Sequence, residues 1–178
     1  MFRSVLTPSR REGGSIRLVV SVLLAIAVAV GGWFMMSSGS KAPEVTYMSL
    51  RGDQISTDDL KGKVVLVNFW ATSCVTCVKK MPMLIEAYKE YNPQGFEVVA
   101  VAMHYDPPNY VAHFTETRQL PFTVALDPTG SVAKEFGDVR LTPTAFLIDR
   151  EGRIVKRYLG EVDEARFKAD IEAALMSS

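Results

Sequence analysis

The sequence predicts a three-layer α/β/α sandwich with a mixed sheet, formed by one domain of the 178-residue chain. Two near-continuous apolar runs, residues 64–69 and 96–103, are typical of central strands that are buried on both faces. Segments with helical periodicity alternate with strands, and the chain ends in a strand pair followed by a helix. This alternation predicts helices on the faces of a sheet that contains both parallel and antiparallel strands.

The other elements follow from local patterns. Residues 45–50 and 54–55 flank Arg51-Gly52-Asp53 and predict an N-terminal hairpin, and residues 57–60 predict a short helical turn. Apolar residues recur at helical spacing after Cys74 and predict a helix that runs to Tyr91. The remaining elements are expected to be a helix at 110–117, a strand at 122–126, a helix at 131–136, strands at 145–148 and 154–159, and a helix at 163–176.

The N-terminal part predicts a membrane anchor. Residues 18–36 carry no charge, and nineteen residues form a helix about 28 Å long, close to the roughly 30 Å of a bilayer core. Residues 1–17 hold four arginines against one acidic residue, and this excess keeps that end in the cytoplasm. We therefore expect a single-pass protein of the inner (cytoplasmic) membrane, with the rest of the chain facing the periplasm or the cell exterior.

A cleavable signal peptide is the alternative interpretation, and Ser38-Gly39-Ser40 offers a weak cleavage site. Residues 37–43 read as a flexible linker, and residues 44–178 have a length suited to one domain. From Lys41 onward the chain has 16 Lys and Arg against 19 Asp and Glu, giving 16 − 19 = −3. This charge predicts no nucleic-acid partner.

The only two cysteines, Cys74 and Cys77, stand two residues apart where a strand passes into a helix. A helix N-terminus favours a thiolate, because unpaired N–H groups and the positive end of the helix dipole face the sulfur. Cys74 is therefore the expected nucleophile, and Cys77 is expected to attack the mixed disulfide and release the product. The pair predicts a redox enzyme.

Two other uses of the cysteines are weaker. A structural disulfide gains more stability from a long loop than from one this short. A structural zinc site needs four ligands, and His104 and His113 are the only histidines that could join the cysteines. No metal is therefore expected, and the absence of a G-x-G-x-x-G motif predicts no flavin or nicotinamide cofactor.

Three motifs together resemble the thioredoxin superfamily: F-W-A-x-x-C-x-x-C after a buried strand, Pro82 five residues beyond Cys77, and L-T-P-T-A-F-L-I-D later in the chain. The N-terminal hairpin, the central insertion between Phe96 and Pro128, and the anchor are similar to the TlpA/ResA-type branch of membrane-anchored thiol-disulfide oxidoreductases. The resemblance covers residues 44–175.

The resemblance implies roles for further residues. A cis peptide is expected between Thr142 and Pro143, with Pro143 facing the disulfide and Thr142 offering backbone hydrogen bonds to a substrate. Trp70 matches the aromatic residue that begins the family motif and is expected at the substrate site, with core packing as the alternative. Asn68 stands where cytosolic thioredoxins have a buried aspartate.

Lys80 departs from the branch, which often has a glutamate at this position. Lys80 follows Cys77 by three residues on the predicted helix, so its side chain is expected near the same helix face as Cys77. An ammonium there favours the thiolate and lowers the thiol pKa. The alternative is a lysine that extends into solvent.

The resemblance implies an enzyme that reduces disulfides in exported proteins, such as apocytochrome c or copper-site precursors, with electrons from a membrane thiol donor. We expect it to be a monomer. Two other functions have weaker support. A peroxiredoxin-like peroxidase usually has a threonine three residues before its reactive cysteine, but Ala71 stands there. A Sco-like copper delivery protein uses C-x-x-x-C with a distant histidine, but no histidine follows His113.

Overall fold

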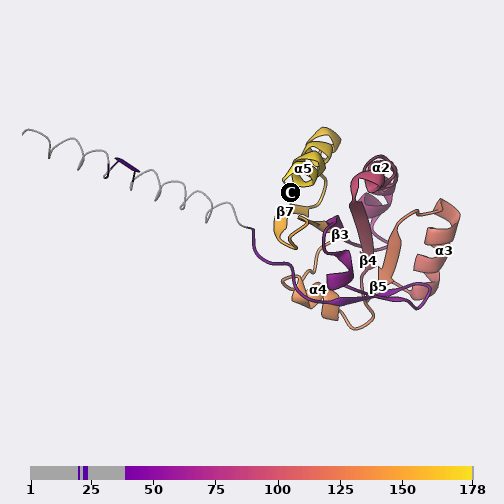
Figure 1. The fold of residues 1–178 in the computed structure, drawn as a ribbon. Coiled ribbons are helices and arrows are strands. Elements are labelled where there is room, and N and C mark those ends of the chain that lie inside the picture. The colour runs from indigo at the N-terminus through magenta and orange to yellow at the C-terminus, as the bar shows by residue number, and fades with distance from the viewer. Residues whose placement is uncertain (1–19, 21, 24–38, 178) are drawn as a thin grey trace, which may run out of the picture. The chain divides into compact units, whose positions relative to one another are not determined.

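The computed structural model describes Val20, Val22, Leu23 and residues 39–177 (Figure 1). The chain divides into two compact units, Met1–Ser38 and Gly39–Ser178. In the first unit the three described residues are helical, and the rest of the predicted anchor at 18–36 lies outside the described residues. Within the described residues, no helix is both long enough and apolar enough to cross a membrane.

The second unit is built on a seven-stranded sheet with the order β2-β1-β5-β4-β3-β6-β7. The three central strands β5, β4 and β3 are parallel, and the pairs β1/β2, β1/β5, β3/β6 and β6/β7 are antiparallel. The predicted mixed sheet and N-terminal hairpin are therefore confirmed. The strands are β1 (Thr46–Ser49), β2 (Gln54–Ser56), β3 (Val64–Trp70), β4 (Phe96–Ala102), β5 (Thr123–Leu126), β6 (Thr144–Ile148) and β7 (Ile154–Leu159).

Helices cover both faces of this sheet (Figure 1). One face packs against α2, α3 and α5, and the other packs against α4 and the short 3-10 helix η1. A second 3-10 turn, η2, connects α2 to β4. The helices are η1 (Asp58–Leu60), α2 (Val75–Tyr91), η2 (Asn92–Gln94), α3 (Pro108–Arg118), α4 (Ser131–Glu135) and α5 (Glu164–Met176).

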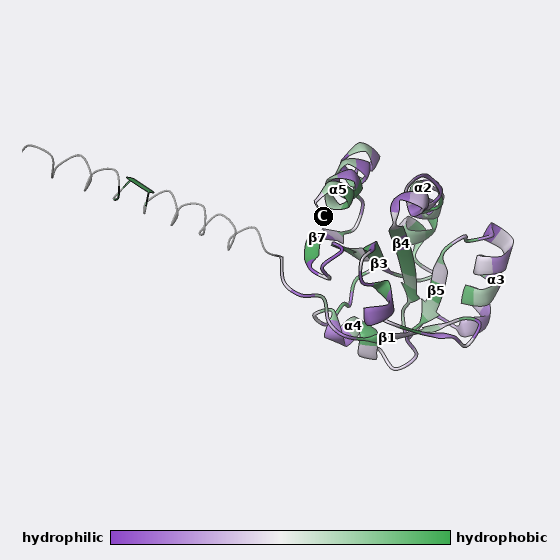
Figure 2. Cartoon of the chain, viewed as in Figure 1, coloured by the Kyte–Doolittle hydropathy of each residue, from purple (hydrophilic) through white to green (hydrophobic). Residues whose placement is uncertain are grey.

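Strand β3 contributes side chains to the hydrophobic core on both faces of the sheet. All seven of its residues are buried, and successive side chains point to opposite faces of the sheet. Leu66 and Trp70 therefore pack under α2, whereas Val67 and Phe69 pack towards α4. Figure 2 shows the same pattern, with hydrophobic strands at the centre and hydrophilic residues on the outer surfaces of the helices. The strand ends at Trp70, and the short loop of residues 71–73 leads from it to Cys74.

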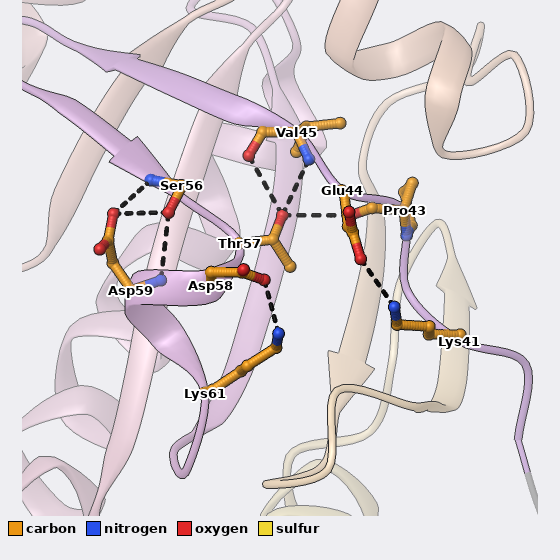
Figure 3. Close-up of polar contacts among 9 residues, drawn as sticks. All are labelled: Lys41, Pro43, Glu44, Val45, Ser56, Thr57, Asp58, Asp59 and Lys61. Atoms are coloured by element: carbon orange, nitrogen blue, oxygen red, sulfur yellow. Dashed lines mark hydrogen bonds and ion pairs between the residues drawn. The ribbon is translucent and has the colours of Figure 1, made fainter.

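The N-terminal segment of this unit is attached to the sheet rather than free. The backbone N–H of Ile154 donates to the Ser40 carbonyl, and that of Ala42 donates to the Gly152 carbonyl, both at 2.8 Å. The hydroxyl of Thr57 accepts a hydrogen bond from the Val45 N–H at 3.0 Å and lies within hydrogen-bond distance of the Pro43 carbonyl (Figure 3). The compact domain thus begins at Gly39. The predicted boundary at Glu44 was too late, because backbone pairing of this segment with distant residues is not visible in a local pattern.

Candidate active site

The two cysteines lie at the N-terminal end of α2, directly after β3 and a short loop. Cys74 is the N-cap residue of α2, and its extended backbone turns the chain into the helix. The Cys77 backbone N–H donates to the Cys74 sulfur at 3.2 Å. The two residues form a disulfide, with their Cα atoms 5.2 Å apart. The predicted placement of a dithiol pair at a helix start is confirmed.

The two sulfur-bearing residues differ in exposure. Cys74 is partly exposed, whereas Cys77 is 3% exposed and belongs to the core beneath α2. An external thiol or disulfide therefore has access to Cys74 and not to Cys77. This asymmetry supports the expected roles of Cys74 as nucleophile and Cys77 as resolving thiol.

The peptide bond between Thr142 and Pro143 is cis, as expected from the resemblance. Pro143 is buried at the start of β6, and its carbonyl accepts a hydrogen bond from the Gly160 N–H at 2.8 Å. Pro143 and Cys77 line the same small cavity, of about 30 Å³. The structure thus brings together two motifs that are far apart in the sequence.

Lys80 also lines this cavity. Its Nζ donates to the carbonyls of Gly160 at 3.3 Å and Val162 at 3.4 Å, on the segment that follows β7. Partial burial lowers the pKa of Lys80, against a smaller opposing effect of the Glu161 carboxylate. The side chain is therefore partly exposed and lies at the cavity wall, with its ammonium at these two carbonyls.

Asn68 supplies another polar side chain at the cavity, which is otherwise lined mainly by apolar residues. It is 6% exposed and lies on β3 between Leu66 and Trp70, on the face covered by α2. A cavity of this volume can hold about one water molecule between polar groups. Asn68 and Lys80 are thus two of the polar side chains that line this cavity together with Cys77.

Trp70 does not lie at the substrate surface. Its side chain is 0% exposed and packs against Phe114 of α3, with ring centroids 5.2 Å apart. The expectation that Trp70 binds substrate is wrong, because a side chain without exposed surface cannot touch a docked peptide. The alternative, core packing, is the one that the structure supports.

Two site residues were missed in the sequence. Asp106, 5% exposed, binds the loop before Cys74 through Thr72. The neighbouring Tyr105 is 48% exposed, and its hydroxyl lies 3.4 Å from the Thr142 hydroxyl. The sequence D-P-P-N at residues 106–109 is typical of a turn. No local signal distinguishes a turn aspartate from one whose side chain bonds to a loop 34 residues away.

Comparison with known proteins agrees with this site. The model of the Redoxin family matches residues 37–175. The chain is 36% identical over 151 residues to the thiol-disulfide oxidoreductase ResA of Bacillus cereus, covering 80% of this chain and 86% of that protein. Its identity to ResA of Bacillus subtilis is 35% over 153 residues, covering 81% of this chain and 84% of that protein.

Solved structures give the same result. A thioredoxin candidate from Neisseria meningitidis is 39% identical and superposes with a TM-score of 0.73, covering 78% of this chain and 93% of the other. A thiol:disulfide interchange protein of the thioredoxin family from Chlorobium tepidum is 27% identical, with a TM-score of 0.71 and coverage of 77% and 97%.

Proposed function

Because this chain belongs to the Redoxin family of the thioredoxin superfamily and is a thiol-disulfide oxidoreductase, we propose that it reduces disulfides in exported proteins through the Cys74/Cys77 pair. The observation that supports this proposal most directly is the disulfide, which joins a partly exposed and a buried cysteine at a helix N-terminus. Such a pair accepts two electrons on reduction and returns them to a substrate on reoxidation.

The proposed cycle begins with both thiols reduced. The Cys74 thiolate attacks one sulfur of a substrate disulfide, and the other substrate sulfur leaves as a thiolate. The Cys77 thiolate then attacks the Cys74 sulfur, which forms the observed disulfide and releases the second substrate sulfur. The substrate gains two electrons and the enzyme loses two. A membrane thiol donor restores the dithiol by the reverse exchange.

The Cys77 N–H assists this cycle at one atom. It donates to the Cys74 sulfur, and the same bond stabilises a thiolate there because hydrogen bonds to a charged acceptor are stronger than those to a neutral one. The helix N-terminus adds the positive end of the α2 dipole. Both effects favour Cys74 as the first attacking group.

Thr142 and Pro143 form the proposed substrate-binding edge. Pro143 lies at the cavity that Cys77 lines, and Thr142 is the more exposed of the two. We propose that the Thr142 backbone pairs with an extended substrate segment, which holds the substrate cysteine against Cys74.

Lys80 is proposed to tune the thiols. Its ammonium is held at the cavity wall by two carbonyls, and a positive charge near a thiol favours the thiolate. Stabilising the thiolates stabilises the reduced state and makes the couple more oxidising. Lys80 would therefore make this protein a milder reductant than a relative with a carboxylate there.

We propose that the domain acts outside the cytoplasm and is attached to the membrane by residues 18–36. The uncharged run and the arginines before it support this placement. Disulfides form readily in such compartments. A protein that must keep its thiols free there, such as apocytochrome c or a copper-site precursor, requires a reductant.

The redox potential of the pair tests the proposed direction. Thioredoxin, a reductant, has a potential of about −270 mV, and DsbA, a strong oxidant, about −120 mV. Equilibration of the protein with glutathione or dithiothreitol, together with an insulin reduction assay, should place it near the reducing end. A potential near the oxidising end would overturn the reductase in favour of an oxidase. Copper titration of the reduced protein in parallel would expose a copper delivery function, if tight binding accompanied weak reductase activity.

A further inference from the structure

A recess of about 470 Å³ lies beside the proposed substrate-binding edge. Tyr105 forms part of its wall, and the Tyr105 hydroxyl lies 3.4 Å from that of Thr142. The recess therefore adjoins the residue expected to pair with substrate. It is separate from the small cavity behind Cys77, with which it shares no lining residue.

The base of the recess is apolar and its rim is basic. Met103, Ala133 and Val139 supply the buried apolar surface. The side chains of Lys134, Arg140 and His104 also line it, and all three residues are exposed. Such a recess suits a side chain that has methylene groups and a charged end.

The charges around the recess favour an anion. Nε and one Nη of Arg140 both donate to a single Asp138 oxygen, and the other guanidinium donors have no partner among the described residues. Lys134 forms no ion pair within the part of the chain that the structure describes. Among the lining residues, the cations of Lys134 and Arg140 stand against the single carboxylate of Asp138, giving 2 − 1 = +1. This local excess contrasts with the net charge of −3 from Lys41 onward.

We propose that this recess is a subsite for an acidic side chain, glutamate or aspartate, that flanks the reacting cysteine of the substrate. The inference rests on the proposed reductase function. A substrate segment paired with Thr142 is extended and advances about 3.3 Å per residue. A side chain one or two residues from the substrate cysteine then passes over Tyr105, and its carboxylate meets Lys134 and Arg140.

Two disulfide-linked peptides test the subsite, identical except for glutamates or glutamines on both sides of one cysteine. The full-length protein, reduced beforehand, should reduce the glutamate peptide with a kcat/KM about two- to fivefold higher, as expected for an exposed charge pair. This preference should decrease as salt is added, because salt screens exposed charges. Equal rates for the two peptides in the wild type would overturn the proposal.

Substitutions assign the preference to the recess. Lys134→Gln should reduce the preference and Lys134→Glu should abolish or reverse it, with reduction of the glutamine peptide unchanged. Lys89→Glu is the matched control, since Lys89 is an exposed lysine in the last turn of α2, at the end of the helix away from Cys74. If Lys134→Glu slowed both peptides equally, the subsite would be wrong. If the wild type reduced neither peptide, the proposed reductase function itself would fail.

Discussion

The buried carboxylate of Asp106 accepts two hydrogen bonds from Thr72, one from its backbone N–H and one from its hydroxyl, each at 2.6 Å. Thr72 lies two residues before Cys74, in the loop between β3 and α2. Bonds to a charged acceptor are among the stronger hydrogen bonds in proteins. Asp106 therefore fixes the loop that leads to the nucleophile, although it lies on the other side of α2 in the sequence, after β4.

Asp106→Ala should destabilise the domain by about 1–3 kcal/mol, because it leaves the Thr72 donors without their partner. Urea unfolding measures this loss. A double-mutant cycle with Thr72→Val should give a coupling energy of about 0.5–3 kcal/mol. A second variant, Asp106→Asn, separates an effect on the position of the loop from an effect on stability. It is assayed under conditions in which it stays folded, and we expect a lower kcat for insulin reduction. An unchanged kcat in folded Asp106→Asn would leave Asp106 with a structural role alone.

Substitution of each cysteine should have a different result. Cys74→Ser should abolish disulfide reduction, because the accessible nucleophile is lost. Cys77→Ser should still attack substrates but not resolve the product, so that covalent adducts accumulate. The adducts are measured on non-reducing gels of proteins from cells that express and export the variant. Adducts with Cys74→Ser, and none with Cys77→Ser, would reverse the two roles.

Lys80 should affect the titration of the cysteine thiols. Lys80→Glu replaces a cation at the cavity wall with an anion, which disfavours the thiolate and raises the thiol pKa. Lys80→Ala should lie between this variant and the wild type. The order of the thiol pKa values in the three reduced proteins is measured from the ultraviolet absorbance of the thiolate as a function of pH. Lys79→Glu, on the neighbouring exposed lysine, controls for general charge. Three superimposable curves for the wild type and the two Lys80 variants would exclude a role in tuning.

The start of the domain can be located by two truncations. A chain beginning at residue 37 retains the backbone bonds of Ser40 and Ala42, whereas one beginning at residue 44 loses both. At about 0.5–1.5 kcal/mol for each bond, the shorter domain should be about 1–3 kcal/mol less stable to urea. Gly39→Ala in the longer chain should also destabilise, because the added Cβ would lie 2.1 Å from the Ile154 carbonyl oxygen. Equal stability of the two truncations would restore the boundary at Glu44.

Tyr47 should make stability dependent on alkaline pH. Burial raises the pKa of its phenol above the ordinary value of 10.0. Above that pH the unfolded chain loses a proton that the folded protein keeps, so the free energy of unfolding falls as pH rises. Below pH 10.0 the stabilisation is fully present. Tyr47→Phe should reduce the slope of stability against pH by up to about 1.4 kcal/mol per pH unit. An unchanged slope in urea titrations would mean that the phenol ionises in the folded state.

The sequence by itself determined the central strands, the order of helices and strands, and the chemistry of the cysteine pair. These features depend on local signals. A strand buried on both faces needs an apolar run such as residues 64–69, and a dithiol switch needs two cysteines one helical turn apart. The cis peptide before Pro143 came only from the family resemblance, because X-Pro bonds in general favour the trans form.

Only the tertiary structure decided which side chains share the site. It buried Trp70 against Phe114, attached Asp106 to Thr72, placed Lys80 against the carbonyls of Gly160 and Val162, and paired Ser40 with Ile154. In the sequence, Gly160 and Val162 lie 80 and 82 residues after Lys80. Periodicity describes which face of an element is apolar, but not which distant loop that face meets. Packing of the strands and helices brings such loops together, and it therefore decides the environment of the cysteines.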